Sequence, residues 1–213
     1  MDAMVNLLTR RSIRKYKPDM LPREVIEKIA EAGTYAPTGK NQQSPIILAV
    51  TNKALRDRMS ALNAAVLGEE DDPFYGAPVV LVVLAERGNA NHIYDGSLVM
   101  GNLMLAAHAM GVGSCWINRA RQVFDSEEGK AILAQLGIEG DYEGIGNCIL
   151  GYIDGEMLYG DNLLNFVEEN IVLLAFIRSK AADIFTQFQG ITVSYVFIII
   201  EGKADNTLIL NVD

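Results

Sequence analysis

The chain has 213 residues, of which 50% are hydrophobic and 21% are charged, a balance typical of a globular protein. This composition excludes collagen-like, low-complexity and disordered classes, and the length favours one compact domain with a sizeable core. The net charge of -9 argues against a general affinity for nucleic acid or anionic membranes, because both require a basic surface.

The apolar stretches and the cysteines also narrow the class of protein. The longest apolar stretches, 78–85 and 193–200, fall well short of the roughly 18 residues that span a bilayer, and the first residues lack a secretory pattern. Cys115 and Cys148 are too few for a disulfide framework and lack zinc-site spacing. We therefore expect a cytoplasmic protein with reduced thiols and no metal site.

The first predicted elements are helices, a loop and a strand. A short helix follows Asp2, and Pro22, which suits a first helical turn, opens a second helix with one apolar face. Two prolines and a glycine predict a loop over 34–45. A short buried strand at 46–51 and a helix at 53–66 follow.

The second half begins with the clearest strand, PVVLVVLA at 78–85, whose β-branched residues indicate an interior position. A long helix at 91–110 is apolar nearly all round, which predicts burial on most of its faces. The remaining predicted elements are a strand at 114–117, a helix at 126–136 and a strand at 147–153. This mixture indicates an α+β fold or a three-layer sandwich.

The first candidate site is RRSIRKYKP, residues 10–18, which holds five of the 18 basic residues. Guanidinium groups bind phosphate through paired hydrogen bonds, and a hydroxyl between them can complete an anion site. The candidates are Arg10, Arg11, Ser12 and Arg14. The same residues fit a solvated basic turn after a helix, where the dipole favours cations. A localisation or nucleic-acid patch is the weaker third interpretation.

The second candidate site is the loop APTGKNQQSP, residues 36–45, which is rich in small and uncharged polar residues. Its candidate ligand-binding residues are Pro37, Thr38, Asn41 and Gln43. Uncharged donors and acceptors suit the polar edge of a heterocycle. A polar turn between two elements is the competing interpretation.

The third candidate site is GVGSCWI, residues 111–117, where glycines allow backbone amides to face a ligand. The segment is neither a P-loop nor a GxGxxG motif, which disfavours a Rossmann dehydrogenase. A nucleophilic Cys115 would need a basic partner, and the chain has only His92 and His108, so a structural cysteine is favoured.

The two histidines do not indicate a metal site. They stand 16 positions apart without a suitably spaced carboxylate or thiol. His108 falls within an apolar helix, which favours a hydrogen-bonded core histidine over a ligand.

Taken in order, the segments RRSIRKY, APTGKNQQSP, DPFYGAPVVLVV, GVGSCWI and NCILGYIDG resemble the nitroreductase-like family of FMN-dependent oxidoreductases. The resemblance covers residues 1–156. It implies a three-layer α-β-α sandwich with a mostly antiparallel central sheet wrapped by helices. It also implies a homodimer with FMN in two equivalent sites at the subunit interface.

The resemblance also assigns positions to the candidate residues. The FMN phosphate, ribityl chain and pyrimidine edge would contact Arg10, Ser12 and Arg14, with Arg11 adjacent. The partner subunit would supply Pro37, Thr38, Asn41 and Gln43 beside the isoalloxazine ring. The other side of the ring would be lined by Gly113, Ser114, Cys115 and Trp116.

The activity implied is oxidoreduction in which the flavin carries the chemistry, so no catalytic side chain is predicted. NADH or NADPH would reduce FMN, and a small-molecule acceptor such as a nitroaromatic, quinone or enone would reoxidise it in ping-pong order. The alternative is a flavin-binding carrier or interaction module of the same fold without turnover. It is motivated by the lack of the family's basic Lys-x-Arg pair after GYIDGE.

Residues 157–213 form an atypical C-terminal extension with two interpretations. One is a helix at 158–177 that wraps the other subunit, followed by strands at 191–200 and 207–212. The other is a sequence with no settled fold, whose apolar segments favour aggregation.

Overall fold

A four-stranded antiparallel sheet forms the centre of the unit that the computed structural model describes, residues 1–155. Its spatial order is β1-β2-β4-β3. The strands are Ile46–Val50 (β1), Val79–Glu86 (β2), Gly113–Ile117 (β3) and Tyr142–Gly151 (β4). The predicted α+β class and antiparallel sheet are confirmed. The elements predicted for the C-terminal extension lie outside the described residues.

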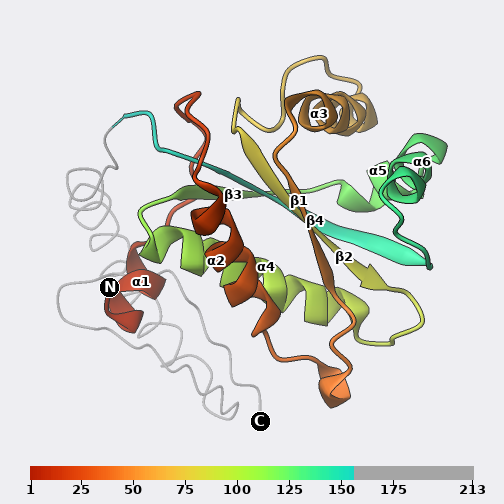
Figure 1. Cartoon of the computed structure of the whole chain (residues 1–213), viewed down its shortest axis with the longest axis horizontal. Coiled ribbons are helices and arrows are strands. Elements are labelled where there is room, and N and C mark those ends of the chain that lie inside the picture. Colours follow the sequence, from red (N-terminus) through yellow and green to blue (C-terminus); the bar gives the residue numbers. More distant parts are fainter. Residues whose placement is uncertain (156–213) are drawn as a thin grey trace, which may run out of the picture. The chain divides into compact units, whose positions relative to one another are not determined.

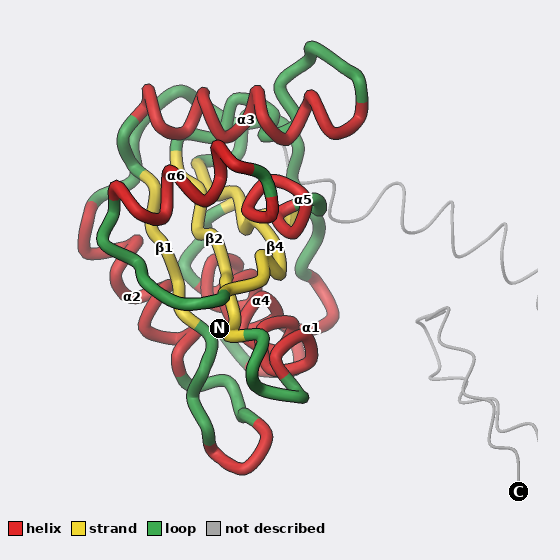
Figure 2. Tube along the Cα trace, turned by 90° about the vertical axis from the view of Figure 1, so that its right-hand side faces the viewer, coloured by secondary structure: helices red, strands yellow, loops and turns green. Residues whose placement is uncertain are grey.

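Helices cover both faces of the sheet, which makes the predicted three layers (Figures 1 and 2). One layer contains α2 (Arg23–Thr34) and α4 (His92–Ala109), with the short α1 (Ala3–Thr9) against α4. The opposite layer contains α3 (Lys53–Leu67), α5 (Ala120–Asp125) and α6 (Glu127–Gln135). Among these helices of residues 1–155, none has both the length and the apolar character needed to cross a bilayer.

Strand β2 joins the two apolar cores that lie on either face of the sheet. Its residues from Val79 to Ala85 are all 0% exposed. Val80 packs into the core under α3, α5 and α6, and its neighbour Leu81 packs into the core under α2 and α4. Because both faces are covered, the strand reads as a continuous apolar run instead of an alternating one.

The last strand differs from the one predicted at 147–153, because β4 begins at Tyr142 and ends at Gly151. Two glycines in its first half lowered the strand propensity. A Cβ on Gly144 would lie 2.4 Å from the Ala120 carbonyl carbon, and one on Gly146 would lie 2.6 Å from Trp116 Nε1. These positions therefore need glycine because neighbouring chain segments approach the strand closely.

Helix α5 was not predicted. It has 6 residues, which is too short to give a periodic pattern. It also follows Arg119, whose left-handed backbone (φ 73°) begins the turn out of β3.

A buried arginine attaches the 68–78 loop to α3. Arg56 is 7% exposed, and its guanidinium donates to Asp72 at 2.6 Å and to the Ala77 carbonyl at 3.0 Å. Asp72 also accepts hydrogen bonds from the Ser60 hydroxyl and the Phe74 amide. Burial opposes ionisation of Asp72, but these hydrogen bonds outweigh it and hold the pKa of the carboxyl below its ordinary value.

We predict that Asp72→Asn lowers the free energy of unfolding by about 2 kcal/mol at pH 7, because the buried Arg56 loses the closer of its two carboxylate partners and keeps only Asp57, 3.2 Å away. The folded-state pKa of Asp72 is depressed, so its stabilisation is present above the unfolded pKa of about 3.9. It disappears as the pH falls through the folded-state value. Urea unfolding at several pH values should show the wild-type advantage closing below about pH 4. The control is Asp71→Asn at the exposed neighbouring position. An equal loss of unfolding free energy in that variant would contradict the role assigned to the Arg56–Asp72 contact.

Candidate functional site

The N-terminal basic segment lies along the free edge of β3. Ser12 pairs with Ser114 as a parallel bridge, and the Ile13 amide donates to the Ser114 carbonyl at 2.9 Å. A Cβ on Gly113 would lie 2.9 Å from the Ile153 side chain and 3.1 Å from that of Ile13. Glycine at 113 therefore permits this close approach. The structure thus brings the first and third candidate segments together.

Arg10 presents a buried donor at this edge. Its Nη1 is inaccessible to solvent and has no hydrogen-bond partner among the described residues. A buried donor without a partner costs about 1–3 kcal/mol, and more when it is charged. A guanidinium group prefers a carboxylate or phosphate as its acceptor. A carboxylate or phosphate oxygen beside Arg10 would satisfy this donor.

The neighbouring candidates are placed differently. Arg11 is exposed, and its Nη1 donates to the carbonyls of Leu8 at 3.0 Å and Arg10 at 2.8 Å. It therefore covers carbonyls at the C-terminus of α1, as in the basic-turn interpretation. Ser12 and Arg14 are exposed on the same segment. Their roles, like that of Arg11, stay predictions.

His108 is a hydrogen-bonded core histidine, as predicted. It is 5% exposed, and its Nε2 lies 2.8 Å from the Thr9 hydroxyl. Burial lowers the pKa of His108, and the positive charges of Arg10 and Arg11 lower it further. The imidazole is therefore neutral at pH 7, and arginines supply the positive charge at this place.

The side chains of the third candidate segment alternate between the two cores. Cys115 is 1% exposed in the core under α3, α5 and α6, which confirms the structural cysteine. Cys148 lies in the opposite core, and burial raises the pKa of its thiol to about 12. Trp116 is half-buried, and its Nε1 has no partner among the described residues. Residues 1–155 contain no group of three or more His, Cys, Asp or Glu that could hold a metal ion.

The second candidate segment forms an exposed loop after α2. Pro37, Asn41 and Gln43 are exposed, and Thr38 is half-buried. The Thr38 hydroxyl accepts hydrogen bonds from the Gln43 amide at 3.1 Å and from Gln43 Nε2 at 3.2 Å. These contacts fold the loop onto itself.

The loop and helix α1, which directly precedes the arginines, lie at opposite ends of α4 (Figure 1). The Gly39 amide donates to Asp95 in the first turn of α4, whereas Thr9 contacts His108 in its last turn. The two contact points are separated by about 20 Å at the helical rise of 1.5 Å per residue. One chain therefore does not bring the second candidate segment to the first.

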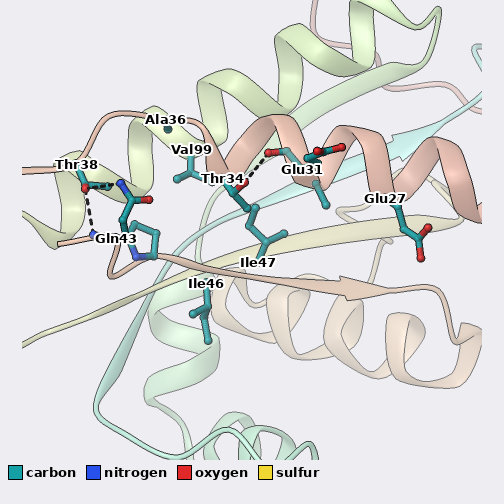
Figure 3. A pocket seen from close by; sticks show the side chains of 11 residues that line it. Glu27, Glu31, Thr34, Ala36, Thr38, Gln43, Ile46, Ile47 and Val99 are labelled. Carbon is teal, nitrogen blue, oxygen red and sulfur yellow. Dashed lines mark hydrogen bonds between the residues drawn. The ribbon is translucent and has the colours of Figure 1, made fainter. Parts of the chain in front are cut away.

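A groove of about 630 Å³ runs between α2 and the edge strand β1. Figure 3 shows Thr38 and Gln43 at one end of it and Glu27 of α2 at the other. Ile47 and Val99 contribute apolar surface. The groove includes neither the arginines nor Gly113–Trp116, so the chemistry discussed above is not concentrated there.

Two polar residues that hold the loop were missed by the sequence analysis. Asp95 is 3% exposed and Asn89 is 8% exposed, and both lie at the start of α4 against the loop. The sequence did contain a signal for Asp95, which is a carboxylate within an otherwise apolar helix. Such a group is buried only where hydrogen-bond donors surround it.

The model of the nitroreductase family matches residues 7–73 and 63–152, which together exceed half of the chain. The chain belongs to the nitroreductase family. A relative from Archaeoglobus fulgidus named as an NADH dehydrogenase/NAD(P)H nitroreductase is 32% identical over 152 residues, covering 68% of this chain and 82% of that relative.

One further relative and one solved structure are similar to this chain. A Methanothermobacter thermautotrophicus protein with the same name is 29% identical over 120 residues, 54% of this chain and 60% of that relative. The chain thus spans less than two thirds of that relative's length. A nitroreductase from Bacteroides fragilis, solved with bound FMN, has a TM-score of 0.68 and 27% identity, covering 76% of this chain and 94% of that one.

Proposed function

We propose that this chain is an FMN-dependent NAD(P)H oxidoreductase that acts as a homodimer in the cytoplasm. The observation that carries the proposal is the buried guanidinium nitrogen Nη1 of Arg10, which has no hydrogen-bond partner within residues 1–155 and precedes the Ser12–Ser114 bridge. A phosphate fits this place, because it supplies charged acceptor oxygens to a donor that lacks one. The Bacteroides fragilis nitroreductase, which resembles this chain, was solved with bound FMN.

In this proposal, Arg10 binds the FMN phosphate, while Ser12, Arg14 and the adjacent Arg11 contact the phosphate, ribityl and pyrimidine groups. Residues Gly113–Trp116 face the ring through their backbone, since the Cys115 side chain lies in the core. Bound FMN would take a hydride from NADH or NADPH and deliver electrons to a small-molecule acceptor. Nitroaromatics, quinones and enones are the acceptor classes that we propose.

A second copy would complete the site. The loop with Pro37, Thr38, Asn41 and Gln43 contacts α4 about 20 Å along the helix from the contact made by Thr9, which directly precedes the arginines. In our proposal the loop therefore contacts the FMN of the partner subunit. The exposed side of α4 supports this arrangement. Tyr94 is 71% exposed, Ile93 46% and Leu98 47%. Large exposed apolar side chains on one helix favour a protein interface.

The proposal is tested by the visible spectrum of the purified full chain. We expect flavin absorbance, or its appearance after FMN is added, and bleaching when NADH or NADPH is added without oxygen. A nitroaromatic or quinone should then restore the absorbance. A chain that neither contains nor takes up FMN would reject the proposal. A bound flavin that no nicotinamide bleaches would favour the carrier without turnover.

We predict that Arg10→Ala weakens FMN binding by about 1.5–3 kcal/mol, because a charged hydrogen bond to phosphate is lost. Fluorescence titration of the FMN-free protein measures this. Arg23→Ala is the matched control, because it removes the same charge from the exposed surface of α2. Equal affinities of the two variants would return the arginine segment to the basic-turn interpretation.

We also predict that Leu98→Asp separates the dimer and weakens FMN binding by at least about tenfold, because a carboxylate is costly in an apolar interface. Sedimentation or light scattering gives the mass. The control is Val66→Asp on α3, an apolar residue that is 41% exposed in the opposite layer. A dimer that persists in Leu98→Asp would exclude this face as the interface.

A further inference from the structure

The loop that follows α2 has an unusual backbone. Lys40, Asn41 and Gln43 all adopt left-handed conformations, with φ values of 55°, 55° and 51°. Side chains other than glycine disfavour this region, and each such residue raises the energy of the loop. All three are exposed, so core packing does not hold them in place.

Buried polar groups at the start of α4 hold the two ends of this loop. Asp95 Oδ1 accepts the Gly39 amide at 2.9 Å, and Asp95 Oδ2 accepts Asn89 Nδ2 at 3.2 Å. Asn89 Nδ2 also donates to the Ser44 hydroxyl at 3.1 Å. Gly39 and Ser44 flank the left-handed residues, so this set of contacts clamps the loop from both sides.

The clamp leaves little freedom at its contact points. Asn89 is itself fixed, because its Oδ1 accepts the Asn91 amide at 3.0 Å. A Cβ on Gly39 would lie 2.2 Å from Asn91 Nδ2, so the loop lies directly against the start of α4. The clamp therefore fixes the position of the exposed loop relative to helix α4.

We propose that Asp95 and Asn89 are positioning residues that hold loop 37–44 in the conformation that contacts the cofactor bound by the partner subunit. This inference rests on the proposed FMN function and names the residues that prepare one half of that site. The clamp touches neither the arginines nor the strand edge. Its contribution is preorganisation, because the loop does not have to be ordered when the ligand binds.

The size of the effect follows from the population of the held conformation. If the released loop occupies that conformation about one tenth of the time, the apparent dissociation constant of FMN rises about tenfold. A purely structural role for Asp95 would instead lower the stability of the whole unit and leave the affinity of the folded protein unchanged.

The experiment compares Asp95→Asn with Asn102→Ala in the full chain. Asn replaces Asp95 without a change of shape, but its amide cannot accept from both Gly39 and Asn89. The control removes the bond from Asn102 Nδ2 to the Ala32 carbonyl of α2, 3.1 Å long, which lies about two turns further along α4 and outside residues 37–44. Both variants therefore lose polar contacts of the same helix.

Hydrogen exchange of the FMN-free protein measures how well the loop amides are protected, and FMN titration measures the affinity of the site. For Asp95→Asn we expect amides in residues 37–44 to exchange about tenfold faster and FMN to bind about tenfold more weakly. Asn102→Ala should leave both unchanged. Ser44→Ala opens the other end of the clamp without altering the buried carboxyl, and we expect a smaller loss of about threefold.

Each outcome is decisive. Unchanged exchange of the loop in Asp95→Asn, or faster exchange with unchanged FMN affinity, overturns the positioning role. Equal effects of Asp95→Asn and Asn102→Ala overturn it as well, because they indicate a general loss of stability. If Asp95→Asn does not fold, unchanged exchange and affinity in Ser44→Ala overturn it. A wild-type chain that takes up no FMN overturns the proposed function, and the positioning role with it.

Discussion

Helix α4 sets the distance on which the arrangement of the candidate site depends. Its 18 residues extend about 27 Å at 1.5 Å per residue. Its first turn holds the loop through Asp95, and its last turn contacts α1 through His108. Because the length of the helix is fixed, a ligand that contacts both polar segments would lie between two chains in the proposed dimer. Cofactor binding and dimer formation would then be linked by mass action.

The sheet makes the other end of the site rigid. β2 is buried on both faces, and β4 lies between it and β3, so the strand that carries Ser114 is fixed by the centre of the fold. The free edge of β3 would expose unpaired backbone groups, and the N-terminal segment covers part of it through Ile13. The same contact that completes the sheet also places Arg10. Local stability and the proposed ligand binding thus depend on one short segment.

The sequence predicted the features that depend on nearby residues. The β-branched run of β2, the apolar α4 and the polar loop were all recognised from local patterns. The features it missed depend on contacts between distant residues. Glycine is needed at position 144 of the strand because Ala120 lies against it. The burial of Asp95 is explained by the hydrogen bond that it accepts from the distant Gly39 amide. Arg10 and Arg11 are identical in type, and only tertiary packing distinguishes the half-buried Arg10 from the exposed Arg11.

Both ends of α4 carry a local cost that the fold itself does not require. At one end a guanidinium nitrogen is buried without a partner in the described part of the chain, and at the other end three exposed residues have left-handed backbones. The cores on both faces of the sheet are large enough to offset such costs of a few kcal/mol. A ligand that accepts a hydrogen bond from Arg10 would satisfy its guanidinium group. If the same ligand contacts the partner's loop, the left-handed loop conformation would serve that contact. Backbone strain on an exposed loop and a buried polar atom without a partner are each typical of a binding site.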